Sequence, residues 1–301
     1  MSKSISIQAG NKLNLAGKLM DVTFGEGKLS DGRQYQRATV TIRVTQTYGG
    51  KTETSDIQVG MFATPTTSTG KANPAWKSLE DLKLMRTAQN VGIDNASHVR
   101  LTGATLQENN FVSRQGNLIN GWQIRGSFIN EAKVSDVASF VTDIFIMKMD
   151  DEFDREGNTT GRLKIQGGIV QYGGKLDVVD FIVEAPDTVE YIQRNWETEG
   201  TVTVKGRIRV LSQEEEVAAS GWGEDVPETT TRFVRELIIT TGDDACKEED
   251  FAYDPAEIKK AFNERKAAIE QMQMNARTTA PKQGANSANA PEATSKKYSW
   301  E

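Results

Sequence analysis

Alternating apolar and polar residues recur through the first 62 positions of the chain. Residues 11–24 alternate leucines with polar neighbours on either side of Gly17, which predicts a strand with a bend at that glycine. The turn at residues 47–51 leads to a third strand at residues 52–62. The second strand has an apolar face and a polar face, formed respectively by Ala38, Val40, Ile42 and Val44 and by Tyr35, Arg37, Thr39, Thr41 and Arg43.

The spacing of apolar residues changes at residues 76–92, where it becomes helical. Two more strands are predicted at residues 98–103 and 122–128. A polar loop over residues 108–121, with one aromatic side chain and one arginine, lies between them. Three strands, a helix and two strands is the order of the OB-fold, a five-stranded barrel. We therefore predict that residues 1–130 form a first OB-fold.

Residues 131–241 follow the same order a second time. The expected strands are residues 139–151, 162–172, 175–185, 201–210 and 231–241, with a helix at residues 186–200. The best internal match aligns residues 99–103 with residues 202–206, because each segment follows a helix and precedes a polar loop and a closing strand. The predicted fold class is mainly β, with two tandem OB-fold-like five-stranded barrels plus a C-terminal helix and a disordered tail.

The region after the second barrel has two predicted parts. Residues 242–275 form an acidic connector and an amphipathic helix, with Asp254 as the N-cap and Pro255 in the first turn. Residues 276–301 have the composition of a disordered tail. Tyr298 and Trp300 form an aromatic tip where such a tail is usually polar.

Composition excludes several classes of function. Cys246 and His98 are the only cysteine and histidine, so a zinc site, a disulfide framework and a histidine-based catalytic set within one chain are excluded. The acidic stretch at residues 150–161 lacks the glycine and glutamate positions of a calcium loop. The chain also lacks a phosphate-binding loop with its lysine. We predict no enzymatic activity, no cofactor and no metal.

Three further patterns concern the compartment. A membrane span needs a run of about eighteen apolar residues, and the chain contains none. Its N-terminus lacks the apolar segment of a secretory signal. A single thiol in an acidic segment suits a reducing compartment. The predicted location is therefore the cytoplasm.

The net charge of −6 is unevenly distributed. Residues 1–130 contain 15 Lys and Arg against 9 Asp and Glu, whereas residues 131–241 contain 12 against 22. Residues 242–301 contain 9 against 11. A basic first region suits a nucleic-acid partner, although the average charge of the chain does not.

The polar face of the second strand and its flanking loops form the candidate DNA-binding site. OB-folds bind single strands on this face, where aromatic rings stack on bases at about 1–3 kcal/mol each and cations follow the phosphates. The alternative is an ordinary solvated strand face. The candidate DNA-binding residues are Lys28, Arg33, Tyr35, Arg37, Arg43, Lys51, Phe111 and Arg114.

Other aromatic residues receive different predictions. Trp76, Trp122 and Phe128 follow the apolar period of their segments, so we expect them in the core or in helix packing. Trp222 lies in an acidic loop at residues 211–229, which would repel phosphate, so we predict that it binds a protein partner, together with Tyr298 and Trp300. The second barrel either binds DNA through cations such as Arg162, Lys164, Lys175, Arg207 and Arg209 or serves as a protein-contact module. We favour the module.

The segments VRLTGATLQENNFVSRQGNLINGWQI and YQRATVTIRV resemble the corresponding segments of phage-type single-stranded DNA-binding proteins, which are OB-fold proteins. The resemblance implies sequence-tolerant coating and protection of single-stranded DNA in phage replication or recombination, without enzymatic activity. It also implies recruitment of replication or recombination proteins through the C-terminal region. The tail departs from the family because its tip contains Lys296 and Lys297, and its acids lie upstream at residues 243–250.

Two other functions fit the sequence. One is a non-enzymatic protein-interaction scaffold built on paired OB-like barrels, which would show no salt-dependent binding to oligonucleotides. The other is a binder of RNA or oligosaccharide, because the same barrel face serves those ligands.

Overall fold

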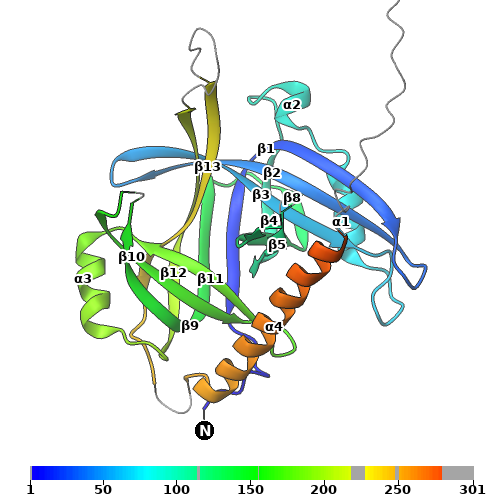
Figure 1. Cartoon of the computed structure of the whole chain (residues 1–301). Coiled ribbons are helices and arrows are strands. Elements are labelled where there is room, and N and C mark those ends of the chain that lie inside the picture. The colour runs from blue at the N-terminus through cyan, green and yellow to red at the C-terminus, as the bar shows by residue number, and fades with distance from the viewer. Residues whose placement is uncertain (1, 114–115, 155, 218–227, 248–250, 280–301) are drawn as a thin grey trace, which may run out of the picture.

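The computed structural model describes residues 2–113, 116–154, 156–217, 228–247 and 251–279, and these residues are mainly in strands (Figure 1). The strands are β1 (Asn11–Lys28), β2 (Gln34–Tyr48), β3 (Lys51–Ala63), β4 (His98–Glu108), β5 (Phe111–Val112), β6 (Leu118–Ile119), β7 (Trp122–Gly126), β8 (Phe128–Glu131), β9 (Val137–Phe153), β10 (Thr159–Val170), β11 (Leu176–Val183), β12 (Thr201–Val217) and β13 (Glu228–Gly242). The helices are α1 (Pro74–Leu82), α2 (Ala88–Val91), α3 (Pro186–Asn195) and α4 (Pro255–Thr279).

Eleven of these strands form one continuous sheet in the order β10-β11-β13-β12-β9-β1-β2-β3-β7-β4-β8. The prediction of two separate barrels is therefore not confirmed in that form. The physical reason is that β1 pairs with β9 along residues 11–16 and 137–142, so the hydrogen-bonded ladder continues from one half of the chain into the other. A short hairpin of β5 and β6 forms a second sheet.

Two additional pairings give this sheet an internal repeat. β4 pairs back onto β1, which closes the cycle β1-β2-β3-β7-β4, and β10 pairs back onto β9, which closes the cycle β9-β10-β11-β13-β12. We call these the first ring and the second ring. Each ring contains a parallel contact between its third and fifth strands, at residues 59–61 with 124–126 and at Ile182 with Ile238. The repeat seen in the sequence is therefore present in the strand pairings.

One glycine in each ring lets the backbone of a neighbouring strand approach closely. A Cβ on Gly17 of β1 would lie 2.1 Å from the carbonyl oxygen of Arg43, and a Cβ on Gly206 of β12 would lie 2.0 Å from that of Ile238. Both contacts are impossible for any other residue without a backbone shift. At Gly17, where a bend was predicted, the structure shows this close approach of the β2 backbone, and the bend itself stays a prediction.

The apolar faces of the strands form a continuous core. Ala38, Val40, Ile42 and Val44 of β2 are buried, as the alternation predicts. Trp122 is buried and Trp76 is partly buried against the core, which agrees with the packing role expected of both. Phe128 is partly exposed. None of the described helices is long and apolar enough to cross a membrane.

Three local elements differ from the predictions. The helix expected at residues 76–92 is divided, because α1 ends at Leu82 and α2 begins only at Ala88. The polar loop at residues 108–121 contains the β5–β6 hairpin. Much of the acidic loop expected at residues 211–229 is strand, because β12 continues to Val217 in register with β13.

Helix α4 runs along both halves of the chain (Figure 1). Asp254 caps it as predicted, accepting a hydrogen bond from the backbone N–H of Ala256 at 2.8 Å. Ile258 and Ala261 are buried, and the Arg265 guanidinium pairs with Glu108 at the end of β4, with Nε 2.7 Å from Oε2. The same carboxylate accepts from the backbone N–H of Val178 in β11 at 3.2 Å. Glu108 therefore joins α4 and the two rings.

Candidate nucleic-acid interface

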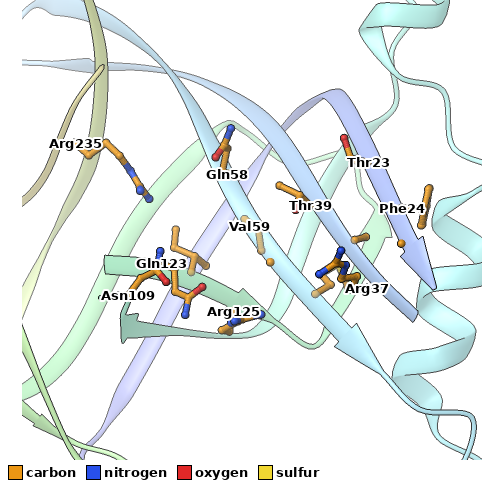
Figure 2. Close-up of a pocket in the computed structure, with 15 residues that line it drawn as sticks. Thr23, Phe24, Arg37, Thr39, Gln58, Val59, Asn109, Gln123, Arg125 and Arg235 are labelled. Atoms are coloured by element: carbon orange, nitrogen blue, oxygen red, sulfur yellow. The ribbon is translucent and has the colours of Figure 1, made fainter. Parts of the chain in front are cut away.

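A groove with a volume of about 510 Å³ crosses the outer face of the first ring (Figure 2). Its floor consists of small or apolar groups on β2, β3 and β7. Polar and cationic side chains form its walls. The lining residues are Thr23, Phe24, Gly25, Arg37, Ala38, Thr39, Gln58, Val59, Gly60, Met61, Asn109, Gln123, Ile124, Arg125 and Arg235.

Two of the wall cations lie across glycines on neighbouring strands. A Cβ on Gly25 of β1 would lie 2.7 Å from Nε of Arg37, and a Cβ on Gly60 of β3 would lie 3.2 Å from a terminal nitrogen of Arg125. The missing side chains leave room for each guanidinium to rest along the sheet. Both arginines are exposed, so the glycines place cations over the groove without burying them.

The third cation comes from the second ring. Arg235 lies on β13, and its guanidinium carbon is 4.2 Å from the centre of the Trp122 ring. Partial burial lowers the pKa of Arg235, although the side chain still reaches solvent. A lowered arginine pKa still leaves the group charged at neutral pH. Figure 2 shows this side chain at the end of the groove opposite Phe24.

The groove has an uncompensated positive charge. None of its lining residues in the described part of the chain is Asp or Glu. Within that same part, Arg37, Arg125 and Arg235 have no carboxylate in salt-bridge range. A cation without a protein counterion is available to an anionic ligand, and guanidinium groups bind phosphate oxygens well.

Aromatic rings flank the cations. Tyr35 and Phe62 stack with their ring centres 5.4 Å apart, and the Phe62 side chain is 48% exposed. A Cβ on Gly27 would lie 2.7 Å from the Tyr35 hydroxyl, so this ring also lies across a glycine of β1. Phe24 lies at the end of the groove, with Nζ of Lys83 5.7 Å from its ring centre. The face therefore combines stackable rings with free cations.

Several predicted DNA-binding residues are paired within the protein. Arg43 donates two hydrogen bonds to Asp56, at 2.7 and 2.6 Å, and this carboxylate raises the pKa of Arg43. Arg33 pairs with Asp31 in the β1–β2 turn, with Nε 2.8 Å from Oδ2. Lys51 lies 4.0 Å from Glu53. The predicted contact of Arg33, Arg43 and Lys51 with DNA stays a prediction. For each of them, a phosphate would have to compete with the carboxylate that the cation already contacts.

The remaining predicted residues are distributed more widely. Lys28 is exposed at the end of β1, and Phe111 is 49% exposed on the β5–β6 hairpin rather than in the groove. Arg114, Trp222, Tyr298 and Trp300 lie outside the described residues. The structure thus brings Tyr35 and Arg37 together on one face with cations that the sequence did not single out.

Four of the cations predicted for the second barrel are held by carboxylates. Arg209 binds Glu236 at 2.5 Å and Glu184 at 3.0 Å, and Arg162 binds Glu236 at 2.6 Å. Arg207 has a side chain only 7% exposed and binds Glu53 at 2.5 Å. Glu184 also accepts a hydrogen bond from Arg207, whose guanidinium lies over the Tyr48 ring. Lys164 pairs with Asp180 at 2.7 Å.

Sequence reasoning missed Arg125, Arg235 and Phe62. Arg125 and Phe62 alternate with buried neighbours on β7 and β3, so the period of each strand could have placed them on the outer face. Arg235 gives no such signal, because its place in the first ring's groove depends on the packing of β13 across the two halves. The glycines at residues 25, 27 and 60 are a further signal of this face in the sequence.

Comparison with solved structures supports the class of fold. The wild-type single-stranded DNA-binding protein from Thermus aquaticus matches with a TM-score of 0.51 and 9% identity, over 80% of this chain and 96% of that chain. An internal-deletion variant of the same protein matches with a TM-score of 0.49 and 10% identity, over 82% and 98%. The chain has an OB-fold like that of single-stranded DNA-binding proteins. No curated protein sequence matches it.

The family follows from a separate comparison. The model of the YorF family matches residues 9–275, which includes every helix and strand up to most of α4. The chain belongs to the YorF family.

Proposed function

We propose that this chain binds single-stranded DNA with little dependence on sequence, in the groove formed by β2, β3, β7 and Arg235. The observation that carries the proposal is the set of arginines over this groove, where none of the described lining residues is a carboxylate. Cations follow a phosphate backbone regardless of sequence, and exposed rings such as Phe62 stack on any base. The likeness to the Thermus aquaticus protein supports the same choice of ligand.

The binding face selects for unpaired bases. Stacking on Tyr35 or Phe62 requires a base whose face is free, which a duplex does not provide. The amides of Asn109, Gln58 and Gln123 also line the groove and can hydrogen bond with bases or sugars. Such contacts tolerate different bases, since an amide both donates and accepts.

In the cell, such a protein would coat and protect single-stranded DNA during replication or recombination, without catalysing a reaction. We propose that it acts in the bacterial cytoplasm as a phage-type protein, and that residues 242–301 recruit other proteins. Each ring would correspond to one OB-type barrel, with residues 1–130 binding DNA and residues 131–241 serving as the acidic module. Trp222, Tyr298 and Trp300 remain the proposed partner contacts.

The test is a fluorescence anisotropy titration of the full chain with labelled oligo-dT, oligo-rU and a duplex. We expect oligo-dT to bind, with an affinity that falls steeply as salt rises because counterions are released. The Arg37→Ala/Arg125→Ala variant should bind at least about tenfold more weakly, since two charge-assisted contacts are lost. The control is Lys164→Ala/Arg194→Ala, which removes the same charge from exposed side chains of the second half. Absence of salt-dependent binding by the wild type would contradict the proposal.

A further inference from the structure

A hairpin from the second ring extends over the groove of the first. Beyond Arg207, the last β12 residue that pairs with β9, the described part of β12 pairs with β13 alone. We call residues 210–217 and 228–235 of this hairpin the arm. It rises past β2 and β3 in Figure 1. The arm thus connects two parts of the molecule that the strand order keeps separate.

The arm is seated on β3 beside the groove. The backbone N–H of Val210 donates a hydrogen bond to the hydroxyl of Ser55 at 3.0 Å, and Ser55 is buried. Val210 is the register partner of Arg235. The contact therefore fixes the arm where Arg235 enters the groove, near Gln58 on the same strand β3.

The two faces of β13 carry side chains of opposite charge, Glu236 on one and Arg235 on the other. Glu236 points toward the second ring, where Arg162 and Arg209 hold its carboxylate. Arg235 points the other way, over Trp122 and into the groove. Since neighbouring residues of a strand face opposite sides, the anchored carboxylate determines where the adjacent guanidinium points.

Phe233 extends the groove-facing side of the arm. It lies two residues from Arg235 on the same strand, so the two side chains share one face at a spacing of about 7 Å. The β12–β13 register runs without a shift from Arg235 to Phe233, which supports this geometry. The Phe233 side chain is 64% exposed, so core packing does not explain an aromatic residue there. A ring followed by a cation on one exposed face suits one nucleotide step of a single strand.

We propose that the bound strand continues from the groove onto the arm, where Arg235 contacts a phosphate and Phe233 stacks on a base. The inference rests on the proposed function, which already includes Arg235 in the groove, and it adds Phe233 of the arm to that DNA site. The DNA path then crosses the boundary between the rings. The second ring contributes to binding through this arm, while its Arg162, Arg207 and Arg209 remain paired.

The test measures salt-dependent affinity of the full chain for a long labelled oligo-dT. Phe233→Ala should weaken binding at least about fivefold without changing the slope of log affinity against log salt, because stacking releases no counterions. Arg235→Ala should lower that slope by about 0.7, as expected for one lost phosphate contact on a single strand. Phe233→Trp should keep the wild-type affinity, because a ring remains available to stack.

Matched controls separate this inference from the proposed function. Phe153→Ala removes an aromatic ring that is 61% exposed at the end of β9, and Arg194→Ala removes an exposed arginine on α3. If Phe233→Ala and Arg235→Ala bind like these controls while Arg37→Ala/Arg125→Ala binds weakly, the arm is not part of the site and the groove still is. If the wild type does not bind oligo-dT, both proposals are wrong.

Discussion

Arg37 and Arg125 of the first ring lie over glycines at an open groove, whereas Arg207 and Arg209 of the second ring are enclosed by Glu53, Glu184 and Glu236. The two rings have the same strand order, and both carry arginines. What distinguishes them is the presence of a protein counterion. A cation that already has a carboxylate partner contributes to stability, and one without a partner is available to a ligand.

The comparison also explains how one ring can support the binding site of the other. The paired arginines of the second ring hold Glu236, and Glu236 is adjacent to the unpaired Arg235. Structural and binding cations are therefore neighbours on one strand, β13. The division of roles follows single side chains rather than whole domains.

The largest expected effect concerns the stability role of the second ring. Arg207→Ala removes the most buried member of this cluster and leaves Glu53 and Glu184 with Arg209 alone, and loss of one member of a buried pair costs about 3–5 kcal/mol. Arg37→Ala should change the free energy of unfolding by less than about 0.5 kcal/mol, because Arg37 is exposed. Urea unfolding followed by circular dichroism measures both. Equal effects of the two substitutions would remove the distinction between the rings.

A second prediction concerns acid sensitivity of the same network. Burial opposes ionisation of Glu236, but hydrogen bonds and charge from Arg162 and Arg209 outweigh it, so the pKa of Glu236 is lowered from 4.5. A group with a lowered folded pKa stabilises the protein above its unfolded pKa, and this stability is lost as pH falls through the folded value. Glu236→Gln should therefore make stability less dependent on pH below about 4.5. Thermal melts at pH 7 and pH 3.5 provide the measurement, and unchanged pH dependence would be the contrary result.

A smaller effect separates two arginines of one strand. Arg37→Ala should weaken binding of oligo-dT about five- to tenfold, as expected for loss of a charge-assisted contact. Arg43→Ala should weaken it less than about threefold, because Asp56 already occupies the Arg43 guanidinium. Anisotropy titrations of both variants in one buffer make the comparison. A larger loss from Arg43→Ala would mean that DNA displaces Asp56.

The smallest expected effect is an increase in affinity for oligo-dT. Asp56→Asn removes the partner of Arg43 while keeping the side-chain size. If pairing with Asp56 keeps Arg43 from contacting DNA, this variant should bind oligo-dT up to about twofold more tightly at low salt. The slope of log affinity against log salt should then be larger by about 0.7. Asp180→Asn, which frees Lys164 on β10, is the matched substitution in the second ring and should leave binding unchanged.

The sequence predicted the strand order and the polar face of β2 because both depend on local periodicity. Alternation identified the buried set around Val40, and the helix caps at Asp254 and Pro255 identified the start of α4. The sequence singled out Gly17, although only the structure shows that the backbone carbonyl of Arg43 requires a glycine there. These features each involve residues that are close in sequence.

The sequence could not predict contacts between distant segments. The pairing of β1 with β9 joins the two rings into one sheet, and it leaves no mark on the alternation of either strand. Arg43 and Arg37 look equivalent in the sequence, and only the position of Asp56 across the β2–β3 ladder separates them. Arg235 enters the groove because Ser55 holds the arm against β3. Charge composition counts cations, but it cannot say which of them have partners.

The measurement that tests the central claim most directly is photocrosslinking of the full chain to an oligonucleotide containing 5-iodouracil, followed by mass spectrometry of the crosslinked peptides. The account predicts crosslinks to peptides of β2, β3 and β7 around the groove, and to the part of β13 that carries Phe233 and Arg235. Crosslinks confined to β10 and to the part of β12 that carries Arg207 and Arg209, where the cations are paired, would contradict it.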